Sequence, residues 1–453
     1  MIRFKTRAVS LILCTVVLSI LSPRYVSAQN QYWAFESIVS GFRPAGAITS
    51  ERMPRACYSS GSTLRFCYRD EEGWHHELIQ STVMGGASTR SVSIDNSDRF
   101  HVVYYGYDIT LMNPWIRYRY RDNQGWHMHT VDNYVFYSGA PTLCLDEGMN
   151  PHITYSAGAL YYWHLGASGA ETEVVDSGIT FNAAIDAFYG SSIAICYENA
   201  DAGELRYTVK GPLGWEYEVV DADDVSISDC RLLHDSAGNP HVVFHDETGQ
   251  SLRYATKESG DWTIETVDDS GIVGQGCSFA LDTFGNPHIS YYDATNGDLK
   301  YAYNYGRGWQ IAFIDTVGDV GKSTTIRLDE FGNVYFFYHD VTHNKIKYAY
   351  PALSMSSSIQ NGSQTLSWSP VGGVNEFWFY GAENDSHFPV ETVWPFNNRL
   401  YVFDSSVISY TTNTGINDPA SNWTYLIIAV DDQYQEIARS DRVGEWDWGM
   451  GIP

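Results

Sequence analysis

One segment of this sequence is written several times along the chain. "CSFALDTFGNPHISYYDATNGDLKYAYNYGRGWQIAFIDT", from Cys277, follows "CRLLHDSAGNPHVVFHDETGQSLRYATKESGDWTIETVDD", from Cys230, at a spacing of 47 residues. A shorter copy, "TIRLDEFGNVYFFYHDVTHNKIKYAY", comes next, and looser copies begin at Arg55, Ser91, Thr142 and Ala183. Apolar and polar residues alternate between turn signals such as Gly-Asn-Pro and Asn-Gly, so each copy predicts four short strands.

A period of 40 to 50 residues with four strands in each unit indicates the blades of a β-propeller. In the copy from Cys277 we expect one strand to end near Leu281, and the others to span 288–293, 299–303 and 309–314. Such a sheet cannot bury both of its faces alone. A closed ring of sheets can, which is a physical reason for repeating the segment.

The two ends of the repeat region complement one another. The last copy stops at Tyr350 without its fourth strand, whereas "QYWAFESIVSG", from Gln31, resembles that missing strand. We therefore predict a seven-bladed propeller over residues 30–352, closed by an N-terminal strand that completes the last blade. Six or eight blades are the less favoured alternatives.

The first 28 residues resemble a secretory signal peptide. A basic start precedes the apolar run Val9–Leu21, and Val26-Ser27-Ala28 provides a small-x-small cleavage signal. That run is too short for a membrane span, and no later segment is apolar enough. We expect a secreted or cell-surface protein, exported by the Sec route and cleaved after Ala28.

The mature chain is strongly acidic. The formal charge is −26, and it becomes −30 on cleavage because the leader carries four basic and no acidic residues. Such a surface repels nucleic acid and anionic membranes. We therefore expect neither nucleic-acid binding nor membrane insertion, and we expect a monomer.

The segment 353–446 differs from the repeats, and a short tail, 447–453, follows it. Trp368 on an early strand and Tyr425 at the start of an apolar strand resemble the fibronectin type III domain, an immunoglobulin-like β-sandwich. In that family the domain mostly serves as a spacer or binding module. The whole chain is thus expected to be all-β.

The repeat itself resembles that of bacterial secreted and surface proteins whose blades carry "LDxxGNPHISYYD…LKYA…GxW…VD", which at the level of fold belong with the sialidase-like propellers. The resemblance implies a fold but no activity, because propellers host many functions. The repeat signature of sialidases, Ser-x-Asp-x-Gly-x-x-Trp, is absent. Arg117, Arg119 and Arg121 alternate along one strand and therefore do not converge from separate blades.

Several polar residues recur at fixed repeat positions, and recurrence favours a structural role. The histidines could ring a metal in the central channel, but we expect each to bond within its own blade; they are His101, His152, His241 and His288. The aspartates before the first turn could bind calcium, but we expect them to cap that turn; they are Asp95, Asp146, Asp235, Asp282 and Asp329.

"DATNGD", from Asp293, resembles a calcium loop but lacks the remote glutamate of an EF-hand. We predict no cofactor, with calcium as the one left open. The tryptophans that begin the fourth strands could stack on sugars, but we expect them to cover outer sheet edges; they are Trp74, Trp126, Trp215, Trp262 and Trp309. The six cysteines of the mature chain are either bridged or buried free thiols.

The clearest departure from the repeat is a longer connection in the second blade, "YGYDITLMNPW". Leu111, Met112 and Trp115 would place apolar side chains on one face, so this loop is the predicted ligand contact. Packing of the loop onto a neighbouring blade is the alternative. We predict a non-enzymatic recognition or adhesion scaffold for a glycan or surface protein. A carbohydrate-active enzyme such as a glycoside hydrolase, and a purely structural surface module, remain the alternatives.

Overall fold

The computed structural model describes residues 32–352 apart from ten short segments, and the backbone of eight strands beyond residue 352. The segments left out are 71, 82–91, 109–112, 134, 136–139, 167–168, 191, 223–225, 259 and 330–331. The chain forms two compact units, Phe35–Tyr350 and, together, Met1–Ala34 and Pro351–Pro453. The described residues contain no helix, which confirms the all-β prediction. The signal peptide predicted over residues 1–28 lies outside the described residues.

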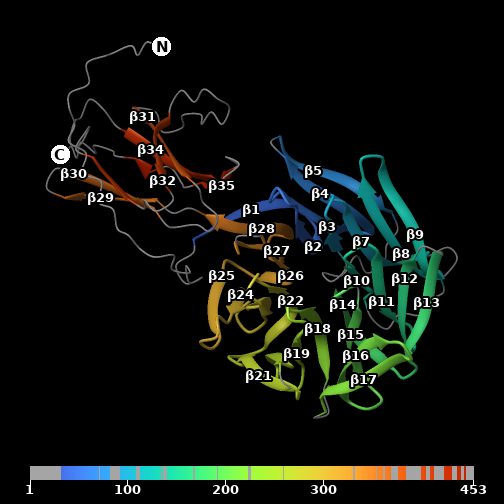
Figure 1. Cartoon of the computed structure of the whole chain (residues 1–453). Coiled ribbons are helices and arrows are strands. Elements are labelled where there is room, and N and C mark those ends of the chain that lie inside the picture. The colour runs from blue at the N-terminus through green and yellow to red at the C-terminus, as the bar shows by residue number, and fades with distance from the viewer. Residues whose placement is uncertain are drawn as a thin grey trace. The chain divides into compact units, whose positions relative to one another are not determined.

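The larger unit consists of seven antiparallel four-stranded sheets arranged around a common centre (Figure 1). Blade 1 is β2 (Phe42–Ile48), β3 (Pro54–Ser60), β4 (Thr63–Asp70) and β5 (Gly73–Gln80). Blade 2 is β6 (Val92–Ile94), β7 (Phe100–Asp108), β8 (Asn113–Asp122) and β9 (Gly125–Asn133). Blade 3 is β10 (Thr142–Leu145), β11 (Pro151–Ser156), β12 (Leu160–Gly166) and β13 (Gly169–Asp176). Blade 4 is β14 (Thr180–Phe188), β15 (Ser192–Asn199), β16 (Glu204–Gly211) and β17 (Gly214–Asp221). Blade 5 is β18 (Ile227–His234), β19 (Pro240–Asp246), β20 (Ser251–Thr256) and β21 (Thr263–Asp268). Blade 6 is β22 (Val273–Leu281), β23 (Pro287–Asp293), β24 (Asp298–Tyr303) and β25 (Gln310–Asp315). The prediction of seven blades is therefore confirmed.

Blade 7 is assembled from both ends of the repeat region. It contains β26 (Val320–Leu328), β27 (Val334–Asp340) and β28 (Lys345–Ala352), and its fourth strand is β1 (Tyr32–Ser40), next to β28. The predicted closure by an N-terminal strand is thus correct. Blade 7 packs tightly on blade 1, since a Cβ added to Gly46 of β2 would lie 2.0 Å from the ring of Phe337.

A buried tyrosine–carboxylate hydrogen bond joins successive blades. The carboxylate ends the fourth strand of one blade, and the tyrosine lies on the second strand of the next. The four pairs are Tyr155 with Asp132 at 2.8 Å, Tyr197 with Asp176 at 2.9 Å, Tyr291 with Asp268 at 2.7 Å, and Tyr338 with Asp315 at 2.6 Å. In three of them a cation also binds the carboxylate: Arg206 binds Asp176, Lys300 binds Asp268, and Lys347 binds Asp315.

A second inter-blade contact lies nearer the outside of the ring. Indole Nε1 groups donate to glutamates on the outermost strand of the preceding blade: Trp74 to Glu36 at 2.9 Å, Trp126 to Glu77 at 3.2 Å, Trp215 to Glu173 at 3.3 Å, and Trp309 to Glu265 at 2.9 Å. Trp262 departs from the pattern, because its Nε1 is buried without a hydrogen-bond partner. In these four cases the tryptophans join blades edge to edge.

The smaller unit contains two sheets. One is formed by β29 (Met355–Gln360), β30 (Ser363–Trp368) and β33 (Ser409–Thr412). The other contains β31 (Glu376–Glu383), β32 (Arg399–Asp404), β34 (Trp423–Val430), β35 (Glu436–Arg439) and β36 (Val443–Gly444). The assignment of this unit to a fibronectin type III-like sandwich stays a prediction.

The cysteines of the propeller are free thiols, and Cys144 alone of the six is not fully buried. Cys196 on β15 of blade 4 and Cys230 on β18 of blade 5 face one another between the two blades, with 3.1 Å between their sulfur atoms. Burial raises the pKa of Cys196 well above its ordinary value. Within the described residues no helix has the length and apolar character needed to cross a bilayer.

Replacing Tyr291 with Phe tests the inter-blade bond to Asp268. The variant removes a buried hydroxyl from a charged acceptor, so we expect the free energy of unfolding to fall by about 1.5–3 kcal/mol. Chemical denaturation followed by tryptophan fluorescence measures the loss. Tyr217→Phe is the matched control, because Tyr217 is 54% exposed and should tolerate the change. Equal stability of the two variants would contradict a stabilising role for the bond.

Candidate functional site

The four repeated histidines contact a tyrosine and an aspartate of their own blades. Nδ1 bonds to a tyrosine hydroxyl on the third strand: His101 to Tyr118, His152 to Tyr162 and His288 to Tyr301 at 2.6 Å each, and His241 to Tyr254. Nε2 faces the aspartate before the turn, at 3.2 Å for His101 with Asp95 and at 3.3–3.7 Å for the other three, which face Asp146, Asp235 and Asp282. A carboxylate only accepts, so this arrangement favours the tautomer with hydrogen on Nε2 and a tyrosine donating to Nδ1.

The five repeated aspartates cap the turn between the first two strands of their blades. Asp282 accepts hydrogen bonds from the backbone N–H groups of Phe284 and Asn286 through one oxygen, and from the Asn286 side chain through the other. The other four aspartates likewise accept the backbone N–H four residues on; they are Asp95, Asp146, Asp235 and Asp329. Burial alone would raise the pKa of Asp282, but the nearby His288 ring and the hydrogen bonds from Asn286 and Phe284 outweigh it and lower the pKa to about 2.

The loop resembling a calcium site is a hairpin turn closed by a lysine. Asp293 accepts the backbone N–H groups of Thr295 and Asn296, and its other oxygen lies 2.8 Å from the Lys300 ammonium. An ammonium therefore stands where a cation would. In the parts of the chain that the structure describes, no group of three or more His, Cys, Asp or Glu side chains is arranged to hold a metal ion.

The predicted ligand contact in blade 2 is only partly described. Leu111 and Met112 lie outside the described residues. Trp115 is 8% exposed and belongs to a hydrophobic core cluster, and a Cβ added to Gly106 would lie 2.2 Å from its ring. The expectation of exposed apolar surface at Trp115 is therefore wrong: because Gly106 has no side chain, the indole packs onto the neighbouring strand.

The three alternating arginines of β8 bind residues nearby instead of converging on a site. Arg121 forms a bidentate pair with Glu77 of blade 1, at 3.0 and 2.6 Å. Arg119 donates to the carbonyl of Ile79, also in blade 1, and Arg117 donates to Asn133 within blade 2.

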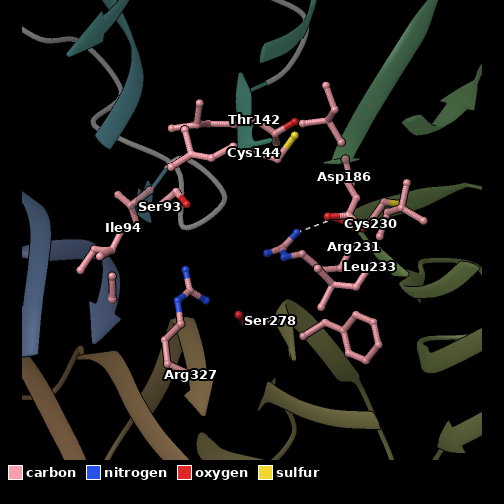
Figure 2. Close-up of a pocket in the computed structure, with 18 of the residues that line it drawn as sticks. Ser93, Ile94, Thr142, Cys144, Asp186, Cys230, Arg231, Leu233, Ser278 and Arg327 are labelled. Atoms are coloured by element: carbon pink, nitrogen blue, oxygen red, sulfur yellow. Dashed lines mark hydrogen bonds between the residues drawn. The ribbon is translucent and has the colours of Figure 1, made fainter. Parts of the chain in front are cut away.

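A pocket of about 380 Å³ lies where the innermost strands of the blades face the centre of the ring. Strand pairing places one residue of each blade at the same level: Ala47, Ser93, Cys144, Asp186, Leu233, Ala280 and Arg327. All but Ala280 line the pocket, and Arg231 and Ser278 line it two residues earlier along their strands. Figure 2 shows the side chains of Arg231, Arg327 and Ser278 pointing into the pocket from three different blades.

The charged groups of the pocket differ in how they are paired. Asp186 accepts hydrogen bonds from the backbone N–H and the ring Nδ1 of His234, each at 2.9 Å. Arg231 donates to the carbonyl of Cys230 at 2.7 Å, and its guanidinium lies 3.8 Å from Asp229. Arg327 donates to the carbonyl of Ile326 at 2.8 Å. Burial, and then the charge of Arg231, lower the pKa of Arg327 to about 10, so it remains charged at neutral pH.

The sequence prediction did not include these pocket residues. A signal was present: aligned on the aspartate before the turn, the repeats read Ser93, Cys144, Leu233 and Ala280 at the position of Arg327. An arginine among small and apolar residues is a departure from the repeat inside a strand, not in a loop.

Comparisons with known proteins provide no function. No family model matches the sequence, and no curated protein matches it. Among solved structures, the chain is similar to a protein of unknown function from Dyadobacter fermentans DSM 18053, with a TM-score of 0.45 and 12% identity. That similarity covers 70% of this chain and 95% of the other.

The buried histidines predict how stability depends on pH. Burial lowers the pKa of His101, His152 and His241, and the nearby aspartates offset this only in part. The unfolded chain then binds more protons below its histidine pKa of about 6.5, so stability falls as the pH drops below that value. The aspartates with lowered pKa add a second loss below about pH 4, when protonation begins in the unfolded chain, and for Asp282 it is complete below a pH of about 2.

We expect the urea concentration at the midpoint of unfolding to decrease when the pH is lowered from 7 to 5. His152→Gln removes one titrating ring and should make the decline shallower, and its stability at pH 7.5 measures the structural cost of the change. A decline of unchanged slope in this variant would exclude His152 as a contributor.

Proposed function

We propose that this protein is an exported, non-enzymatic recognition protein that binds a glycan or surface-protein ligand in the central pocket of its propeller. One observation carries the proposal. The side chains that recur from blade to blade form contacts within and between blades, whereas side chains that do not recur, Asp186, Arg231 and Arg327, gather in the pocket. A structural side chain is needed in every blade, but a ligand is bound once.

The size and surroundings of the pocket support this proposal. Small-molecule sites commonly have volumes of about 300–1,000 Å³, and this pocket has about 380 Å³. A second hollow at the turns of blades 4 and 5 shares Asp186 and Leu233 with it and includes Tyr189, which is 71% exposed. An exposed ring beside the pocket offers a flat face on which a sugar or an aromatic side chain can pack.

The enzyme alternative has less support. Glycoside hydrolysis usually needs two carboxyl groups about 5–9.5 Å apart. Among the described residues that line the pocket, Asp186 is the single carboxylate, and His234 already binds it. Export is inferred from residues 1–28, and a role of the C-terminal unit as a fibronectin type III-like spacer is inferred from Trp368 and Tyr425.

The mature chain, residues 29–453, should bind members of a glycan array, and Ser93→Trp should weaken the strongest interaction at least tenfold. The Ser93 side chain lines the pocket, so an indole there fills the space a ligand would use. Leu213→Trp is the control, because Leu213 is 95% exposed and lies outside the pocket. Calorimetry measures the affinities.

Three results would contradict the proposal. Binding that Ser93→Trp leaves unchanged would place the site elsewhere. An array and a panel of surface proteins that both stay blank would favour a purely structural module. Release of sugar from bound glycans by the unaltered chain would establish the enzyme alternative.

A further inference from the structure

Arg327 is the most unusual charged residue in the propeller. It extends from β26 into the central pocket, and it donates a hydrogen bond to the backbone carbonyl of Ile326, the residue before it. Among the described residues, no carboxylate oxygen lies within 4.0 Å of its guanidinium. The chain has 54 acidic residues and 28 basic ones, so a carboxylate partner would have been easy to supply.

The other charges of the pocket are already engaged. Asp186 is held by His234, and Arg231 lies 3.8 Å from Asp229, whose other oxygen accepts the backbone N–H of Gly276 at 2.8 Å. Arg327 therefore has no carboxylate within ion-pair distance among the described residues, and the charged side chains that line the pocket, Arg231, Arg327 and Asp186, sum to one positive charge. A charge that is partly removed from water and has no ionic partner is costly, and an anion entering the pocket would reduce that cost.

Hydrogen-bond donors surround the same space. A guanidinium presents several N–H groups in a planar fork, and in Arg327 one Nη1 binds a backbone carbonyl. Arg231 brings a second guanidinium to the same space. The Ser278 hydroxyl accepts the backbone N–H of Ile326 at 3.1 Å, so its own hydrogen is available to donate. Figure 2 shows these three side chains directed into one space.

We propose that the central pocket binds a ligand through a carboxylate group, held between Arg231 and Arg327 with Ser278 as a third donor. This inference rests on the proposed function, since it names the ligand class of the same pocket. A carboxylate has one negative charge, which offsets the single net positive charge of the pocket lining, and its two oxygens match the guanidinium fork. A phosphate dianion would exceed that charge in a strongly acidic protein. A uronic acid and the side chain or C-terminus of a peptide both supply the group.

Direct titration of the mature chain tests the ligand class. Glucuronate and glucose differ at one carbon of the same ring, so calorimetry should detect glucuronate and give at least tenfold weaker binding, or none, for glucose. Acetyl-glutamate represents the peptide source. Whichever of glucuronate and acetyl-glutamate binds more tightly identifies the source of the carboxylate. Inorganic phosphate and sulfate serve as competing anions.

Substitution of the arginines tests the site. Arg327→Gln should weaken carboxylate binding at least tenfold, and Arg327→Lys should restore part of it, because the charge returns without the fork. Arg231→Gln should also weaken it. Arg307→Gln is the matched control, since Arg307 is exposed in a loop away from the pocket. Circular dichroism verifies that each variant folds. The comparison of glucuronate with glucose uses the unaltered chain, so it does not depend on the folding of any variant.

The outcomes separate this inference from the proposed function. Equal binding of glucuronate and glucose, or binding that Arg327→Gln leaves intact, would overturn the carboxylate assignment while leaving the pocket as a recognition site. Phosphate or sulfate binding as tight as that of carboxylates would also overturn it. If an array ligand is lost in Ser93→Trp but retained in Arg327→Gln, only the ligand class is wrong.

Discussion

Each blade of this propeller has two faces to bury, and the structure depends on its neighbours to bury them. Apolar side chains supply most of the area buried between blades, but carboxylates at the ends of the fourth strands set how one blade is aligned along the next. Asp268 illustrates this, because it accepts Tyr291 from the next blade and lies 3.2 Å from Lys300. Burial raises the pKa of Tyr291, and the charge of Asp268 raises it further, so the tyrosine remains a donor. A sheet that slipped along its neighbour would leave these groups unpaired in the interior.

The repeat made most of the propeller predictable. Strands expected at 288–293, 299–303 and 309–314 are β23 (Pro287–Asp293), β24 (Asp298–Tyr303) and β25 (Gln310–Asp315). The first two differ by one residue at one end, and the third is shifted by one residue. Alternation and turn residues are local signals that several copies reinforce. Ring closure was also predictable, because the last copy lacks its fourth strand and the segment from Gln31 resembles that strand.

The pocket was not predictable in the same way. Arg231 and Arg327 are 96 positions apart and belong to blades 5 and 7, so only the curvature of the ring brings them to one space. Trp115 shows the opposite error. Its loop departs from the repeat and looks exposed in the sequence, but the missing side chain at Gly106 lets the indole turn inward. Local pattern does not reveal which way a large side chain turns.

Strand β1 is made first, and its partner β28 is the last strand of the ring to be synthesised. Closing the wheel is therefore the longest-range event of folding, and its loop-closure entropy is paid only after every other blade exists. Until then the edges of β1 and β28 that pair in the folded ring have no partner strand. The β1 strand of a second copy offers β28 the same hydrogen bonds, so complete but incompletely folded chains at high concentration can exchange their first strands.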